Sequence, residues 1–131
     1  MNKFAYVTAA GLLGVCLVAS AAKPEPKAAR YPKELIGIWQ GDGPTCELPG
    51  NLDSDTRMDI RPDKLLDYEQ WNLPLSVVQV STRPKAWRIK SRLYIDGDFI
   101  EVYELFALTG HKDRTLTVVD ESRVARYVRC R

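Results

Sequence analysis

Apolar residues alternate with polar ones from Leu35 to the end of the chain, and this alternation constrains the fold more than any other feature. A period of two gives an extended strand one apolar face, whereas an amphipathic helix needs a period near 3.6. Turn-forming residues interrupt the alternation at short intervals, a spacing typical of an all-β sandwich or barrel. The sequence therefore predicts an all-β fold.

Eight segments fit this pattern, and the turn signals between them set their limits. The predicted strands are 35–40, 56–61, 64–70, 75–82, 86–95, 98–108, 115–120 and 123–130. Pro62 and Pro84 interrupt the ladder because proline has no N–H to donate, and glycine and proline make 41–55 a long irregular connection. Eight short antiparallel strands in chain order predict a small up-and-down barrel, in which the first and last strands become neighbours.

The dipeptide Asp96-Gly97 predicts the tightest turn in the chain. Asp-Gly supplies the positive φ angles of a type I′ turn, so Ile95 should face Asp98 and fix the register of the whole hairpin. That register gathers one mostly apolar, inward face: Trp87, Ile89, Ser91, Leu93 and Ile95 opposite Phe106, Glu104, Val102, Ile100 and Asp98. The outer face pairs Arg92 with Glu101, Tyr94 with Phe99 and Lys90 with Tyr103, which are stabilising cross-strand combinations.

The N-terminal residues predict export. Residues 1–21 combine Lys3, an uncharged apolar run and the small residues of an Ala19-x-Ala21 cleavage site, the pattern of a cleaved secretory signal peptide. The apolar run is shorter than a membrane span requires, so a retained anchor is the weaker reading. Cys16 lies in a segment similar to a bacterial lipobox, with Val15 at the position that normally holds a small residue, so lipidation is a minor alternative. Residues 22–33 are expected to form a Pro- and Lys-rich tether, and 34–131 the barrel domain, in the periplasm or outside the cell.

Cleavage leaves two cysteines, Cys46 and Cys130, in a compartment that permits disulfides. We expect them to form one bridge, the alternative being two free buried thiols. Because the closed barrel makes its first and last strands neighbours, the bridge would clasp the barrel seam.

The charge balance and the reactive residues exclude several functions. The chain has 19 Lys and Arg against 17 Asp and Glu, without the one-sided field of a nucleic-acid binder. The basic stripe of Arg88, Lys90 and Arg92 beside Tyr94 is therefore interpreted as a solvated face. The one histidine, His111, falls in a predicted loop, and with both cysteines paired no catalytic constellation remains. The acidic segment 53–59 lacks the glycine and glutamate of an EF-hand. We expect no enzyme activity, metal or cofactor, and a monomer.

The tripeptide Gly37-Ile38-Trp39 in the first predicted strand resembles the opening motif of lipocalins and related calycin barrels. The resemblance implies that Trp39 packs across the closed end of the barrel beneath a basic side chain of the last strand. The candidates are Arg123, Arg126 and Arg129. Gly-x-Trp, a cysteine shortly after it and a terminal Arg129-Cys130 also resemble small exported proteobacterial proteins without an agreed function.

Two polar residues fall on the predicted inner face, Glu104 and Arg126. A buried carboxylate is costly unless it has a partner, so the two either meet inside the barrel or line the polar end of a pocket; the alternative is that both are hydrated near a rim.

Two functions follow from this pattern. In the first, the barrel mouth holds a small apolar or amphipathic ligand, with the ligand-binding residues Trp87, Glu104, Phe106 and Arg126. In the second, aromatic residues fill the short barrel and the 41–55 loop docks into a periplasmic protein, as an inhibitor or immunity protein does.

Overall fold

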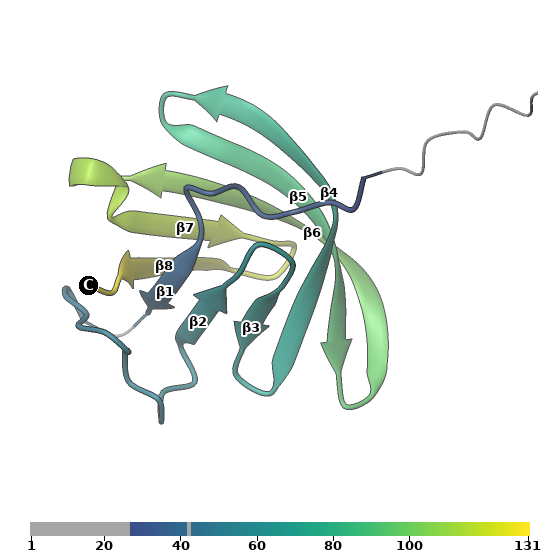
Figure 1. The fold of residues 1–131 in the computed structure, drawn as a ribbon, viewed down its shortest axis with the longest axis horizontal. Coiled ribbons are helices and arrows are strands. Elements are labelled where there is room, and N and C mark those ends of the chain that lie inside the picture. Colours follow the sequence, from purple (N-terminus) through teal and green to yellow (C-terminus); the bar gives the residue numbers. More distant parts are fainter. Residues whose placement is uncertain (1–26, 42) are drawn as a thin grey trace, which may run out of the picture.

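The computed structural model describes residues 27–41 and 43–131, and they form a closed antiparallel barrel (Figure 1). The predicted signal peptide and residues 22–26 of the predicted tether lie outside the described residues. Each strand pairs with the next in the chain, and β8 pairs with β1. The strands are β1 (Gly37–Gln40), β2 (Arg57–Ile60), β3 (Leu65–Asp67), β4 (Gln70–Thr82), β5 (Lys85–Ile95), β6 (Asp98–Thr109), β7 (Thr115–Val119) and β8 (Val124–Arg129). The predicted eight-stranded up-and-down barrel is confirmed.

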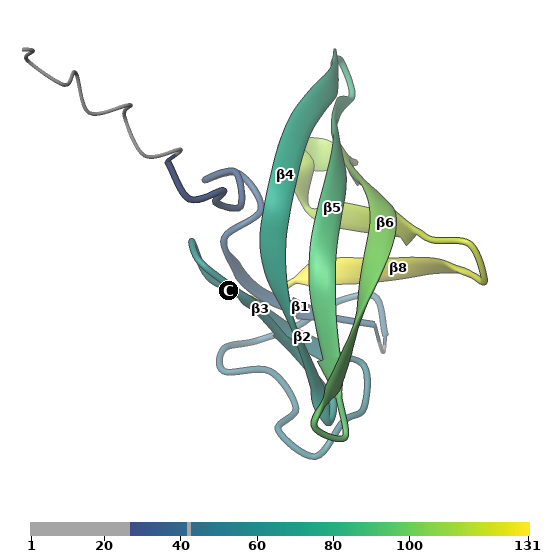
Figure 2. The ribbon, with the colours of Figure 1, turned by 90° about the vertical axis from the view of Figure 1, so that its right-hand side faces the viewer.

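Strands β4, β5 and β6 are much longer than the others, and their hairpins extend past the rest of the barrel (Figures 1 and 2). The predicted β5–β6 register is confirmed, with Ile95 opposite Asp98 and Trp87 opposite Phe106. Strand β4 begins at Gln70 rather than at residue 75, because a register shift between Pro74 and Ser76 lets the ladder continue past the proline.

The outer face of β4, β5 and β6 carries aromatic and charged side chains that pair across strands. Arg92 lies opposite Glu101 as predicted, but Glu101 forms its ion pair with Lys90. The guanidinium of Arg92 instead lies 4.6 Å from the centre of the Phe99 ring. Lys90 and Arg92 are thus engaged by neighbours on the same sheet.

The core fills the end of the barrel at which the β4–β5 and β6–β7 connections lie. Its largest completely buried side chains include Trp39, Leu35, Leu108 and Leu116. Tyr31 also packs in this core, donates its backbone N–H to the carbonyl of Pro62, and is only 4% exposed. The barrel domain therefore includes Tyr31, which was expected to lie in the tether.

Trp39 is covered by Arg129, one of the three arginines proposed for that role. The Arg129 guanidinium lies 4.1 Å from the centre of the indole ring, and Nη1 donates to the Ile36 carbonyl at 2.9 Å. Gly37 has φ +137°, and a Cβ there would lie 3.2 Å from Arg129 Nη1. A side chain at Gly37 would therefore be strained and would crowd the guanidinium.

Replacing Arg129 by alanine is expected to lower the free energy of unfolding by about 2 kcal/mol, because the variant loses the cation–π contact and charge-assisted hydrogen bonds to backbone carbonyls of the N-terminal segment. Urea unfolding followed by Trp fluorescence measures the change. Arg126→Ala, three positions away on the exposed face of β8, is the matched control and should change stability by less than about 0.5 kcal/mol. Equal effects of the two substitutions would contradict the assignment of Arg129 as the residue that covers Trp39 and stabilises the fold.

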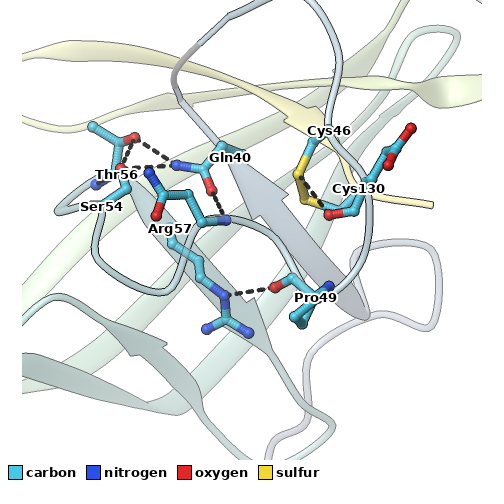
Figure 3. Close-up of a disulfide and its surroundings, with 9 residues drawn as sticks. Gln40, Cys46, Pro49, Ser54, Thr56, Arg57 and Cys130 are labelled. Carbon is cyan, nitrogen blue, oxygen red and sulfur yellow. Dashed lines mark hydrogen bonds between the residues drawn. A yellow bond between two sulfur atoms is a disulfide. The ribbon is translucent and has the colours of Figure 1, made fainter.

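The predicted disulfide joins Cys46 to Cys130 with a Cα separation of 4.3 Å, and Figure 3 shows it at the seam where β1 meets β8. Backbone hydrogen bonds continue beside it, since Arg131 donates its N–H to the Cys46 carbonyl and accepts from Leu48. Such a bridge is typical of an oxidising, extracytoplasmic environment. Among the described residues no helix is long and apolar enough to cross a membrane.

Candidate functional site

A cavity of about 320 Å³ lies at the end of the barrel where the β3–β4, β5–β6 and β7–β8 turns meet; we call this end the mouth. An eight-stranded barrel is just wide enough for its interior to be filled by side chains or to hold one small ligand. Within the described residues the core fills the opposite end, so the interior space for a ligand lies at the mouth. This volume is at the lower end of the range for small-molecule pockets, about 300–1,000 Å³.

The deeper walls of the cavity are apolar and come from several strands. They are formed by Met58 of β2, Leu65 of β3, Leu93 of β5, Val102 and Phe106 of β6, Val118 of β7 and Tyr127 of β8. The side chains of Met58, Leu65, Phe106 and Tyr127 are buried, because alternate residues of each strand point into the barrel. The cavity can therefore take the apolar part of a small molecule.

A polar pair, the half-buried Glu104 and the buried Asn72, interrupts the apolar lining. Glu104 is half-buried and accepts a hydrogen bond from Asn72 Nδ2 at 3.3 Å, while Asn72 is only 3% exposed. The Asn72 oxygen Oδ1 is buried, and no partner for it exists among residues 27–41 and 43–131. A hydrogen-bond acceptor without a donor is costly in a protein interior. The pair thus has an excess of acceptors beside the cavity.

Burial raises the pKa of Glu104 to about 7, and the nearby Asp120 adds to the shift. Arg123 and the hydrogen bond from Asn72 act in the opposite direction without cancelling it. Near neutral pH the side chain is therefore divided between its protonated and its ionised forms.

The rim of the mouth is acidic. Asp67, Glu104, Asp120 and Glu121 line the cavity, and among the described residues that line it Arg123 is the one Lys or Arg. Glu101 is also in the lining, but its carboxylate is paired with Lys90 on the outer face. Arg123 lies 3.5 Å from Asp120, measured from Nε to Oδ2. In the part of the chain that the structure describes, Glu104 has no cation within ion-pair distance. The potential at the mouth therefore favours a positive ligand over a negative one.

Two of the predicted ligand-binding residues do not reach this cavity. Arg126 is exposed on the outer face of β8 opposite Thr117, so the prediction that it points inward and meets Glu104 is wrong. Between Val124 and Val128, apolar residues occur at both even and odd positions, so alternation does not decide which set faces the interior. The barrel buries Tyr127, which has the largest apolar surface of them. Trp87 is buried in the core at the filled end and does not line the cavity.

Glu104 and Phe106 do line the cavity, as the register predicted. Ile95 and Ile100, also placed on the inner face, are 40% and 58% exposed because their hairpin extends past the barrel wall. Asn72 was missed, because β4 begins earlier than its predicted limit and brings this residue into the sheet opposite Leu93.

The connection between β1 and β2 forms a second exposed feature, fastened at several points (Figure 3). The side chain of Gln40 accepts from Asn51 N–H at 3.0 Å, and Arg57 donates from Nε to the Pro49 carbonyl at 2.8 Å. On this fastened loop Leu48 and Leu52 are 59% and 70% exposed. The loop therefore presents apolar side chains from a defined backbone.

The remaining candidates for chemistry lie apart from the mouth. His111 is exposed in the short 3-10 turn η1 (His111–Asp113) at the filled end. Among the described residues no group of three or more His, Cys, Asp or Glu side chains is arranged to hold a metal ion.

Fold and cavity together define a small, disulfide-closed antiparallel β-barrel with an acidic mouth. No family model, curated protein or solved structure matches the chain.

Proposed function

We propose that the protein is an exported, non-catalytic binding module that holds a small apolar or amphipathic molecule in the mouth cavity. The observation that carries this proposal is the cavity itself, with apolar walls beside the polar pair Glu104 and Asn72. Binding sites for small molecules are commonly concave and mainly apolar, with a few polar groups that orient the ligand. The disulfide and the signal-like N-terminus support action in the periplasm or outside the cell.

The arrangement of Trp39 beneath Arg129 supports the lipocalin-like interpretation, because the resemblance at Gly37-Ile38-Trp39 implied this contact. It bears on the architecture of the filled end and not on the identity of the ligand. Cavity volume and lining are specific to this chain, and they carry the functional argument.

A fluorescent titration with N-phenyl-1-naphthylamine, a small neutral apolar dye, tests this function. Replacing Val102 in the cavity wall by tryptophan fills the space and should weaken dye binding by at least about tenfold. Val78→Trp, on an exposed position of β4, is the matched control and should bind the dye as the wild type does. Far-ultraviolet circular dichroism checks that both variants fold. If Val102→Trp does not fold, Ile100→Trp at the same cavity takes its place. Dye binding that is absent from the wild type, or unchanged in the filled variant, would contradict the proposal.

A second function is favoured by the exposed Leu48 and Leu52 on the fastened loop. Apolar side chains held in a defined backbone cost little entropy on binding and are typical anchors of protein interfaces. In this alternative the loop docks into a periplasmic protein. Leu48→Ser together with Leu52→Ser should abolish capture of that protein from a periplasmic extract, whereas Val102→Trp should leave it unchanged.

A further inference from the structure

We propose that the ligand of the mouth cavity is a cationic amphiphile, an organic amine whose protonated nitrogen binds at Glu104 beside Asn72 while its apolar part lies against the barrel walls. This inference rests on the proposed function and adds the chemical class of the ligand. It depends on three observations: the unpaired carboxyl group, the unpartnered amide oxygen and the acidic rim.

The hydrogen bonding beside the cavity calls for a donor. Glu104 accepts one hydrogen bond at its Oε2 atom, and Asn72 Oδ1 accepts none from the described residues. An ammonium group brings several N–H donors and a positive charge, and a charge-assisted hydrogen bond to a carboxylate is stronger than a neutral one. A fatty-acid carboxylate would instead add acceptors to a site that already has too many.

The acidic groups around the mouth also favour a cation at Glu104, and Arg123 opposes them only in part. Asp67 on β3 and Asp120 after β7 raise the negative potential at Glu104, and the positive charge of Arg123 is next to Asp120. The oxygen Oδ1 of Asp120 accepts hydrogen bonds from the Ser122 hydroxyl and from the backbone N–H of Ser122 and Arg123, so it is already satisfied. Glu104 therefore remains as the half-buried carboxylate that a ligand can pair with.

The lining favours an organic cation over a metal ion. A calcium ion requires six to eight oxygen ligands, and among the described residues no cluster of three candidate ligands is present. The rings of Phe106 and Tyr127 line the cavity, and an aromatic face attracts an alkylammonium group that has lost its water. One carboxylate, one amide and aromatic walls suit an amine with an apolar chain.

Binding of the cation should release a proton. The ammonium group pairs with the ionised carboxylate, so the protonated fraction of Glu104 gives its proton to solvent. Tyr31 and Tyr127 also lie near Glu104, but burial raises the pKa of both phenols, which stay protonated through neutral pH. Calorimetry at pH 7 in two buffers of different ionisation enthalpy should show release of about half a proton per ligand.

Matched ligands of one chain length test the inference: n-octylamine, n-octanol and n-octanoate, each titrated into the wild type at neutral pH. The amine is expected to bind at least about tenfold more tightly than the alcohol, and the carboxylate more weakly than both. In Glu104→Gln the preference for the amine over the alcohol should fall to within about twofold. Glu47→Gln removes an equal charge from an exposed position outside the cavity and should keep the preference.

The outcomes separate this inference from the function on which it rests. Equal binding of all three compounds, or tighter binding of octanoate, would overturn the inference and leave a neutral ligand-binding module. A preference that is kept in Glu104→Gln, or that falls equally in Glu47→Gln, would overturn the role of Glu104. Absence of binding by every compound, together with absence of binding by the neutral dye, would overturn the proposed function itself.

Discussion

Replacing Cys46 and Cys130 together by serine is expected to lower the free energy of unfolding by about 4 kcal/mol. The bridge closes a loop across a sequence separation of 84 residues, and in the chain-entropy model such a loop strongly restricts the unfolded chain. For a domain of this size the loss corresponds to a fall in the melting temperature of roughly 20 °C. Thermal unfolding followed by circular dichroism under oxidising conditions measures it.

The reduced wild type is the control for this prediction. A reductant should lower the melting temperature of the wild type to that of the double variant, and it should leave the variant unchanged. A wild type that melts at one temperature with and without reductant would show that the bridge does not restrict the unfolded chain as argued.

Glu104→Gln is expected to stabilise the protein at alkaline pH and to have no such effect in acid. Burial raises the pKa of Glu104 from 4.5 to about 7, so the folded protein holds this proton more tightly than the unfolded chain. Below pH 4.5 the carboxyl group is protonated in both the folded and the unfolded state, so the stability that depends on a protonated Glu104 is fully present. It is lost as the pH rises through 7, and above that the ionised Glu104 destabilises the fold by up to about 3 kcal/mol.

The measurement compares urea unfolding of the wild type and Glu104→Gln from about pH 4 to about pH 8. The charged groups around Glu104 are Asp67, Asp120 and Arg123, and they are present in both proteins, so their titration cancels in the difference. Glu121→Gln serves as the matched variant and should follow the wild-type profile. A difference between wild type and Glu104→Gln that does not change with pH would show that Glu104 titrates normally.

The sequence alone predicts the barrel because local signals agree with the global arrangement. The Asp96-Gly97 turn fixes the β5–β6 register, and period-two alternation then determines which residues face the interior. The same reasoning fails where alternation is ambiguous. In β8 apolar residues occur on both faces of the strand. Packing against Leu116 and the other strands decides that Tyr127 is buried and Val124 is not.

The mouth cavity depends on the lengths of the strands, which the sequence does not reveal. β4 continues past Pro74 and brings Asn72 beside Glu104, while the short strands β2, β3, β7 and β8 leave the space between them. The burial of Tyr31 was likewise not predicted, because the prolines around it indicated a solvated segment. Its ring is in fact buried against Phe106. In both cases the position follows from contacts between distant parts of the chain.

The pairing of β8 with β1 also sets the order in which the molecule can form. Strand β1 lies near the beginning of the domain, and its second edge stays unpaired until the last strand has been synthesised and delivered. During that interval its open N–H and C=O groups are a template for pairing with another polypeptide. Contacts between such distant residues also slow folding. The edge of β1 is therefore open to aggregation for as long as β8 has not paired with it, and closure of the barrel removes this edge.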